Sequence, residues 1–204
     1  FNFDNLSQEV PELNKLEVEL EAITFETPLD SSNVNISTWI TLAKIIEEHY
    51  AKYHGFVILH GSDTMAYSAS ALSFLLEGLS KPVIFTGSQL PIGTIRTDGK
   101  ENLITAIQLA GERNQLGAVV PEVAIYFENA LLRGNRTTKV SAENFEAFQS
   151  PNYPKLAEAG INIKYNKFAI RKSGESSLTV RKKVEDRIAI LKLFPGITEA
   201  YVEA

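Results

Sequence analysis

Three short apolar runs, each stopped by a glycine or by polar residues, constrain the fold of this chain more than any other feature. They occupy residues 56–59, 82–87 and 123–127. Apolar runs of this length are typical of strands buried on both faces, and such strands occur in parallel sheets with helices on either side. The sequence therefore predicts an α/β domain built around a parallel sheet.

Three segments with the spacing of amphipathic helices accompany these runs. Residues 35–53, 64–79 and 98–110 carry apolar side chains three and four positions apart. Gly78 marks the expected end of the second helix. Since parallel strands are joined by right-handed crossovers, we expect helices on both faces of the sheet, which gives three layers.

Outside this frame, two patterns predict antiparallel strands. Residues 16–22 alternate strictly between apolar and polar, which is typical of a strand with one solvated face. Residues 168–171 and 178–181 flank the polar residues 173–177. That arrangement predicts a β-hairpin with a polar tip.

Near the end of the chain, residues 187–196 form another largely apolar run, which ends in a proline and a glycine. A buried strand there needs neighbours on its edges, so we interpret it as the first strand of a second α/β domain. The expected organisation is an N-terminal domain over residues 1–186 and the start of a C-terminal domain over residues 187–204.

Composition excludes several classes of protein. The net charge of -5 argues against a protein that binds the phosphate backbone of nucleic acids. Cysteine is absent, which excludes disulfides and thiol catalysis. The sequence shows neither an apolar run long enough to span a bilayer nor the pattern of a signal peptide. We expect a cytoplasmic protein that binds neither nucleic acid nor membrane.

Polar clusters follow the predicted strands at the edge where open parallel sheets bind their ligands. They lie at residues 30–33, 61–64, 87–89, 128–129 and 133–139. Hydroxyl and carboxylate groups dominate these clusters, so we expect a site for a polar small molecule at this edge.

The tripeptide Ser62-Asp63-Thr64 has two compatible interpretations. Each of these residues is a good helix N-cap, and capping is the commoner role. The same helix end offers N–H groups and partial positive charge to a carboxylate, while Asp63 can pair with an ammonium. Together these features favour a site for an α-amino acid.

A serine hydroxyl needs a base or a cation to become reactive. His60 lies two residues before Ser62, but it is more simply a structural histidine, and the string lacks the second glycine of a nucleophile elbow. A buried Lys139 is the other candidate activator, against the alternative of a solvated surface lysine. His49 and His54 lack metal-ligand spacing and no nucleotide-binding motif occurs, so we expect neither a metal nor a cofactor.

Taken together, these segments resemble the bacterial-type L-asparaginases, and among them the cytoplasmic type I branch. The resemblance is carried by Pro28-Leu29-Asp30-Ser31-Ser32, by His60-Gly61-Ser62-Asp63-Thr64-Met65, by Thr86-Gly87-Ser88-Gln89 and by Arg133-Gly134-Asn135-Arg136-Thr137-Thr138-Lys139. It runs through nearly the whole chain.

The resemblance implies a cofactor-free amidohydrolase that cleaves L-asparagine to L-aspartate and ammonia through an acyl-enzyme, in a homodimer or homotetramer. By the family's pattern, Ser31 contacts the substrate α-carboxylate, Asp63 holds the α-ammonium, and the Ser88 backbone faces the side-chain amide. Ser62, where the family usually has threonine, forms a proton relay with Lys139 and Asp63. The further residues expected at the substrate site are Asp30, Ser32 and Gly61.

One family motif is missing from this sequence. The family's string T-G-G-T-I, whose first threonine is taken as the nucleophile, does not occur here, nor does the flap that follows it. We therefore interpret the chain as an N-terminal asparaginase domain without its first strand. Two alternatives remain open: the ammonia-supplying subunit of a tRNA-dependent amidotransferase, and a non-catalytic amino-acid-binding or regulatory domain.

Overall fold

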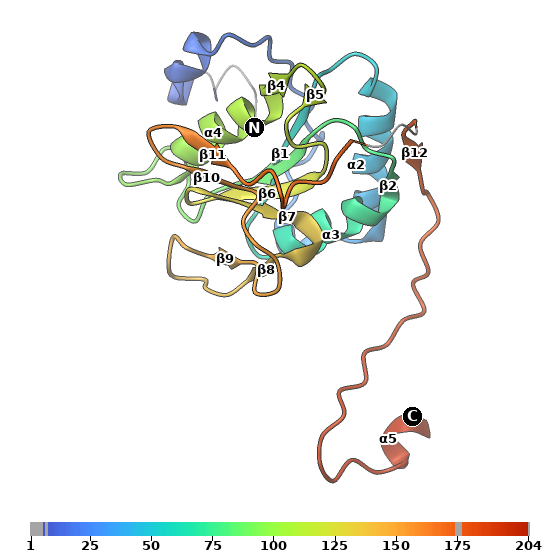
Figure 1. Ribbon diagram of the computed structural model, residues 1–204. Helices are drawn as coiled ribbons and strands as arrows, with labels where there is room; N and C mark the ends of the chain where they lie inside the picture. The colour runs from blue at the N-terminus through green and yellow to red at the C-terminus, as the bar shows by residue number, and fades with distance from the viewer. Residues whose placement is uncertain (1–5, 7, 174–176, 204) are drawn as a thin grey trace.

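A six-stranded sheet forms the centre of the computed structural model, which describes residues 6, 8–173 and 177–203 (Figure 1). Its strands, in spatial order, are β1 (Phe56–Leu59), β3 (Val83–Thr86), β6 (Val123–Phe127), β7 (Ala130–Arg133), β10 (Ala157–Ala159) and β11 (Ile163–Tyr165). The first three are parallel, which confirms the predicted core. The other three join antiparallel, so the sheet is mixed.

Three helices cover the two faces of this sheet. They are α2 (Ile36–His49), α3 (Met65–Leu75) and α4 (Gly99–Gly111). The α2 and α3 helices share one core cluster with Val83 and Phe85, whereas α4 shares the opposite cluster with Ile84. Neighbouring residues of β3 thus point into different layers, and the predicted three-layer α/β architecture is confirmed.

Local sequence explains why α2 begins where it does. The Asn35 side chain accepts hydrogen bonds from the backbone N–H groups of Ser37 and Thr38, at 2.9 and 3.3 Å. The Thr38 hydroxyl accepts in return from the Asn35 N–H, which completes a capping box. This start places residues 30–33 directly before the helix, at the edge of the sheet.

Short elements fill the connections. They are the 3-10 helices η1 (Pro11–Lys15), η2 (Ser31–Asn33) and η3 (Gly134–Arg136), the strands β2 (Leu76–Glu77), β4 (Arg113–Asn114), β5 (Gly117–Ala118), β8 (Thr138–Lys139), β9 (Phe148–Gln149) and β12 (Thr179–Val180), and the helix α5 (Ala200–Glu203). Among them, β8 pairs antiparallel with β9, which fixes the backbone around Lys139.

Residues 16–22 do not form the predicted strand. Leu16 and Leu20 instead pack against a small cluster that includes Leu13 and Leu103, while Val18 is 39% exposed. Strict alternation predicts a strand only where a neighbouring strand offers hydrogen bonds, and within the described residues none pairs with this segment.

The predicted hairpin is also wrong. Residues 168–171 form a turn in which the N–H groups of Ala169 and Ile170 bond to the Asn166 carbonyl. Strand β12 pairs with β2 instead, and this pairing ends α3 at Leu75, before the expected boundary at Leu79. Of the expected tip, residues 174–176 lie outside the described part of the chain.

Residues 187–194 form no strand, although the structure describes all of them. They run away from the body of the molecule (Figure 1), and Ile190 is 94% exposed. A strand needs a partner edge, and this segment has none in the described structure.

In the same described part of the chain, every helix is too short or too polar to cross a membrane.

Candidate active site

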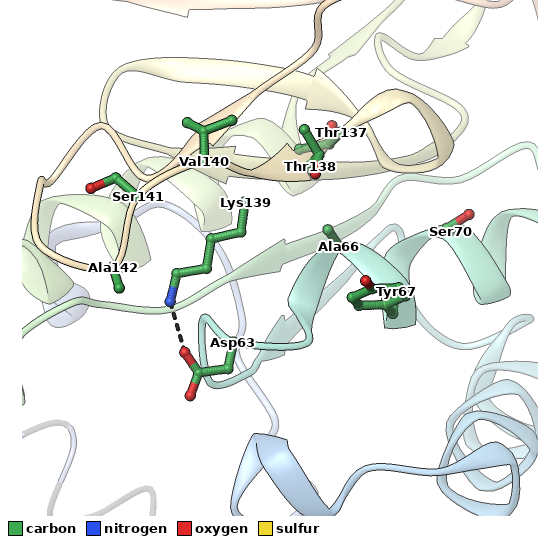
Figure 2. A pocket seen from close by; sticks show the side chains of 10 residues that line it. All are labelled: Asp63, Ala66, Tyr67, Ser70, Thr137, Thr138, Lys139, Val140, Ser141 and Ala142. Atoms are coloured by element: carbon green, nitrogen blue, oxygen red, sulfur yellow. Dashed lines mark hydrogen bonds and ion pairs between the residues drawn. The ribbon is translucent and has the colours of Figure 1, made fainter. Parts of the chain in front are cut away.

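Lys139 is brought to Ser62 and Asp63 across more than seventy residues of sequence. Its Nζ atom lies 2.9 Å from Ser62 Oγ and 2.7 Å from Asp63 Oδ1. The lysine side chain is only 16% exposed, whereas that of Asp63 is 66% exposed. The ammonium end of Lys139 points at the start of α3 (Figure 2). A nearly buried cation thus meets a hydroxyl and a carboxylate that ligands can reach.

Ser62-Asp63-Thr64 does not cap α3, contrary to the capping expectation. Thr64 occupies the N-cap position, but its side chain makes no capping hydrogen bond. Its hydroxyl donates instead to the Ser31 carbonyl at 2.6 Å. The side chains of Ser62 and Asp63 contact Lys139 instead of the first turn of α3, and Thr64 ties this loop to η2.

Ser31 is buried and lies against Gly61. A Cβ atom on Gly61 would stand 2.7 Å from the Ser31 Cβ, so only glycine permits this approach. Asp30 and Ser32 are exposed, and Asp30 Oδ1 accepts hydrogen bonds from the Ser32 N–H and hydroxyl, both at 2.8 Å. These bonds lower the pKa of the Asp30 carboxyl. Ser31 is therefore the residue of this trio that meets the β1–α3 loop.

His60 is a structural histidine, as expected. Its Nδ1 lies 2.7 Å from the Gly61 carbonyl and its Nε2 lies 2.8 Å from Ser68 Oγ. Trp39 Nε1 donates to that same hydroxyl, so the Ser68 proton is left for His60 Nε2. Burial lowers the pKa of His60, which keeps the ring neutral. Both ring nitrogens are thus engaged away from Ser62.

Asp98 and Asn102 shape the loop after β3, and motif reasoning assigned them no role. The Asp98 carboxylate accepts from the N–H groups of Gln89 and Leu90 at 3.0 and 3.2 Å. Asn102 Nδ2 donates to the Gly87 carbonyl at 3.0 Å. Ser88 lies between these anchors, beside Gly99 at the start of α4. The D-x-x-x-N spacing, four residues apart on one helix face, was the available sequence signal.

The polar pair after β6 forms a hairpin turn. Glu128 and Asn129 have φ angles of 42° and 63°, as a two-residue connection between antiparallel strands requires. Burial, together with the charges of Asp98 and Glu146, raises the pKa of Glu128. The Glu128 N–H donates to Asn102 Oδ1 at 3.1 Å, which ties this turn to α4.

A pocket of about 580 Å³ adjoins the Lys139–Asp63 pair (Figure 2). The described residues that line it are Asp63, Ala66, Tyr67, Ser70, Thr137, Thr138, Lys139, Val140, Ser141 and Ala142. It therefore lies between the first turns of α3 and the loop after β8, with charged groups of both signs at its wall.

Comparison with known proteins shows the family of the chain. Residues 1–171 match the family model described as asparaginase, N-terminal. The chain belongs to the asparaginase family. It is 46% identical over 190 residues to L-asparaginase 1 of Escherichia coli, covering 93% of this chain and 55% of that protein. This confirms the resemblance that the sequence motifs indicated.

Solved structures give the same result for this asparaginase-family chain. The crystal structure of L-asparaginase I from Vibrio cholerae matches with a TM-score of 0.87 and 39% identity, covering 99% of this chain and 60% of that chain.

A mouse 60 kDa lysophospholipase is 49% identical over 174 residues, which cover 85% of this chain and 30% of that protein. The chain thus spans less than two thirds of the length of the relatives it matches.

Proposed function

We propose that the full-length protein is an L-asparaginase, which hydrolyses L-asparagine to L-aspartate and ammonia without a cofactor. The carrying observation is the contact of Lys139 Nζ with both Ser62 Oγ and Asp63 Oδ1. A hydroxyl, a lysine and a carboxylate in mutual contact are suited to proton transfer during acyl transfer.

The proposed reaction has two steps. A hydroxyl nucleophile attacks the side-chain amide carbon, the C–N bond breaks, and ammonia leaves with the proton that the relay delivers. Water then attacks the resulting ester, releases L-aspartate and returns a proton to the nucleophile. The family resemblance implies a threonine as nucleophile, in the T-G-G-T-I motif that this sequence does not contain. Ser62, Lys139 and Asp63 take the part of the relay.

Substrate binding follows from the same geometry. Asp63 uses Oδ1 for Lys139, and its exposed carboxylate can reach a substrate ammonium with Oδ2. Ser31, held against Gly61, is proposed to contact the α-carboxylate, and the Ser88 backbone to face the amide. Asp30 and Ser32 complete the η2 side of the site.

The test is ammonia release by the full-length protein and its Lys139→Met variant. We expect release from L-asparagine by the wild type, nearly complete loss in Lys139→Met, and retained substrate binding by calorimetry. Lys155→Met is the matched control, because Lys155 is exposed and its one ion pair among the described residues is with Glu158, three residues away. Wild-type turnover in Lys139→Met would overturn the relay assignment.

The amidotransferase alternative is less favoured. A glutamyl-tRNA(Gln) amidotransferase subunit of Archaeoglobus fulgidus is 30% identical to this chain, against 46% for L-asparaginase 1. Free ammonia from the protein alone supports an asparaginase, while release that requires a second subunit supports the amidotransferase. Asparagine binding without any release supports a non-catalytic domain. A lysophospholipid is assayed in parallel because of the mouse relative's name.

We further propose a cytoplasmic homo-oligomer, dimeric or tetrameric, with an N-terminal domain ending near residue 186. The resemblance supports this assembly, since the second domain in the family helps to complete the neighbouring subunit's site. Light scattering of the full-length protein measures its mass directly. A monomer with full activity would contradict the proposed assembly.

A further inference from the structure

The side chain of Gln89 bridges Ser62 to the loop between β8 and β9. Gln89 Oε1 lies 2.8 Å from Ser62 Oγ, and Gln89 Nε2 lies 3.1 Å from the Asn144 backbone carbonyl. Ser62 Oγ is therefore contacted from two sides, by this amide and by Lys139 Nζ.

The Asn144 carbonyl determines where each proton in this chain of hydrogen bonds lies. A backbone carbonyl only accepts, so the Gln89 NH₂ group must face Asn144 and the amide oxygen must face Ser62. The amide oxygen also only accepts, so Ser62 donates its one hydroxyl proton to Gln89. A lone pair of Ser62 Oγ then accepts from Lys139, which must be the donor.

We propose that Gln89 is a positioning residue that fixes the Ser62 hydroxyl with its proton turned away from Lys139. This inference rests on the proposed function, because it assigns a role within that relay. With one lone pair of Ser62 turned to Lys139 in the resting site, the second is left to accept from an incoming hydroxyl. When Ser62 takes that hydroxyl's proton, its own proton leaves Gln89 and passes to Lys139 Nζ, which completes the relay step. A serine side chain has three staggered χ1 wells, and the Gln89 hydrogen bond selects one of them.

The backbone holds Gln89 in place for this role. Its N–H donates to both oxygens of the buried Asp98 carboxylate at 3.0 Å. Asp98 therefore holds Gln89 in place, and Gln89 in turn orients the Ser62 hydroxyl. None of these contacts requires Gln89 to touch the substrate.

A double-mutant cycle in the full-length protein tests the proposal. Gln89→Met removes the amide at similar length, and we expect kcat for L-asparagine to fall roughly 10-fold with KM unchanged, the effect of one lost hydrogen bond. In a Ser62→Ala background the same change should alter kcat by less than about 2-fold, because Gln89 acts through Ser62. Gln108→Met, an exposed position on α4, is the matched control.

A second measurement on the same cycle does not depend on turnover. If Gln89 and Ser62 share a hydrogen bond, the loss of melting temperature in the double variant is smaller than the sum of the two single losses. The proposal would be overturned if Gln89→Met lowered kcat equally in both backgrounds. It would also be overturned if the loss of melting temperature in the double variant equalled the sum of the two single losses. If the wild type releases no ammonia, the proposed function fails, while the melting cycle still decides the positioning contact.

Discussion

The hydroxyl of Ser31 lies 2.5 Å from the point where a Cβ atom on Gly61 would stand. Together with the hydrogen bond from Thr64 to the Ser31 carbonyl, this contact joins η2 to the end of β1. The position of Ser31 therefore depends on the absence of a side chain thirty residues later.

Gly61→Ala should displace Ser31. The added methyl overlaps both the Cβ and the hydroxyl of Ser31, and overpacking of this kind costs about 1–3 kcal/mol of unfolding free energy. We expect a raised KM for L-asparagine in addition, because the proposed carboxylate contact moves. Steady-state kinetics and urea unfolding measure the two effects. Gly160→Ala is the control, since among the described residues its Cβ would meet one atom, the Asn162 carbonyl oxygen 3.9 Å away. Equal effects in both variants would argue against the contact.

Asp63→Asn keeps the shape of the side chain but removes its charge. A hydrogen bond to a charged group contributes about 1.5–3 kcal/mol, so KM for L-asparagine should rise roughly 10- to 100-fold. Succinamic acid, which lacks the α-amino group, should show little change in KM between variant and wild type. A similar rise for both substrates would mean that Asp63 does not bind the ammonium.

Asp98→Ala should destabilise the fold. The substitution leaves the partly buried N–H groups of Gln89 and Leu90 without their acceptor, which we expect to cost about 1–3 kcal/mol of unfolding free energy. Asp98→Asn retains one acceptor oxygen and should lose less. Urea unfolding of the three proteins compares them, and equal stability of wild type and Asp98→Ala would contradict the anchoring role.

Stability should fall in mild acid because of His60. Burial lowers its pKa in the folded protein below the ordinary value of 6.5, so the unfolded chain binds the proton more readily. The stabilising contribution is complete above pH 6.5 and is lost as pH falls through the lowered pKa. Melting temperatures between pH 8 and 5 should therefore fall less steeply in His60→Gln. Parallel curves for the two proteins would exclude His60 as the titrating group.

Local patterns in the sequence were sufficient for the core of the sheet. The runs Phe56–Leu59 and Val123–Phe127 form the expected parallel strands. Val123–Phe127 is buried throughout, as an uninterrupted apolar run predicts, whereas Phe56–Leu59 stands at the end of the strand order and is only partly buried, so the prediction that it is buried on both faces is wrong. The three-layer arrangement followed from the helices between them. The partner of Thr179–Val180 could not be predicted, since pairing with Leu76–Glu77 joins segments a hundred residues apart.

The candidate site, unlike the core of the sheet, could not be predicted from local patterns alone. Placing Lys139 beside Ser62 required the family resemblance, because no local pattern relates residues 77 positions apart. The cap at Ser62-Asp63-Thr64 was wrong for a physical reason: Lys139 and the Ser31 carbonyl offer these side chains stronger or nearer partners than the first turn of α3. Gln89 was visible in the motif, but its two hydrogen bonds exist only in three dimensions.

Asn102 hydrogen-bonds to the loop after β3 through Nδ2 and to the turn after β6 through Oδ1. Asp98, one helical turn earlier, holds the same β3 loop. The Asn102 side chain therefore sets the spacing between the two loops, and it does so through their backbone groups, not their side chains. Substitutions at the loop tips can change which molecule is recognised without moving one wall of the site relative to the other, so evolution or a designer can vary them independently.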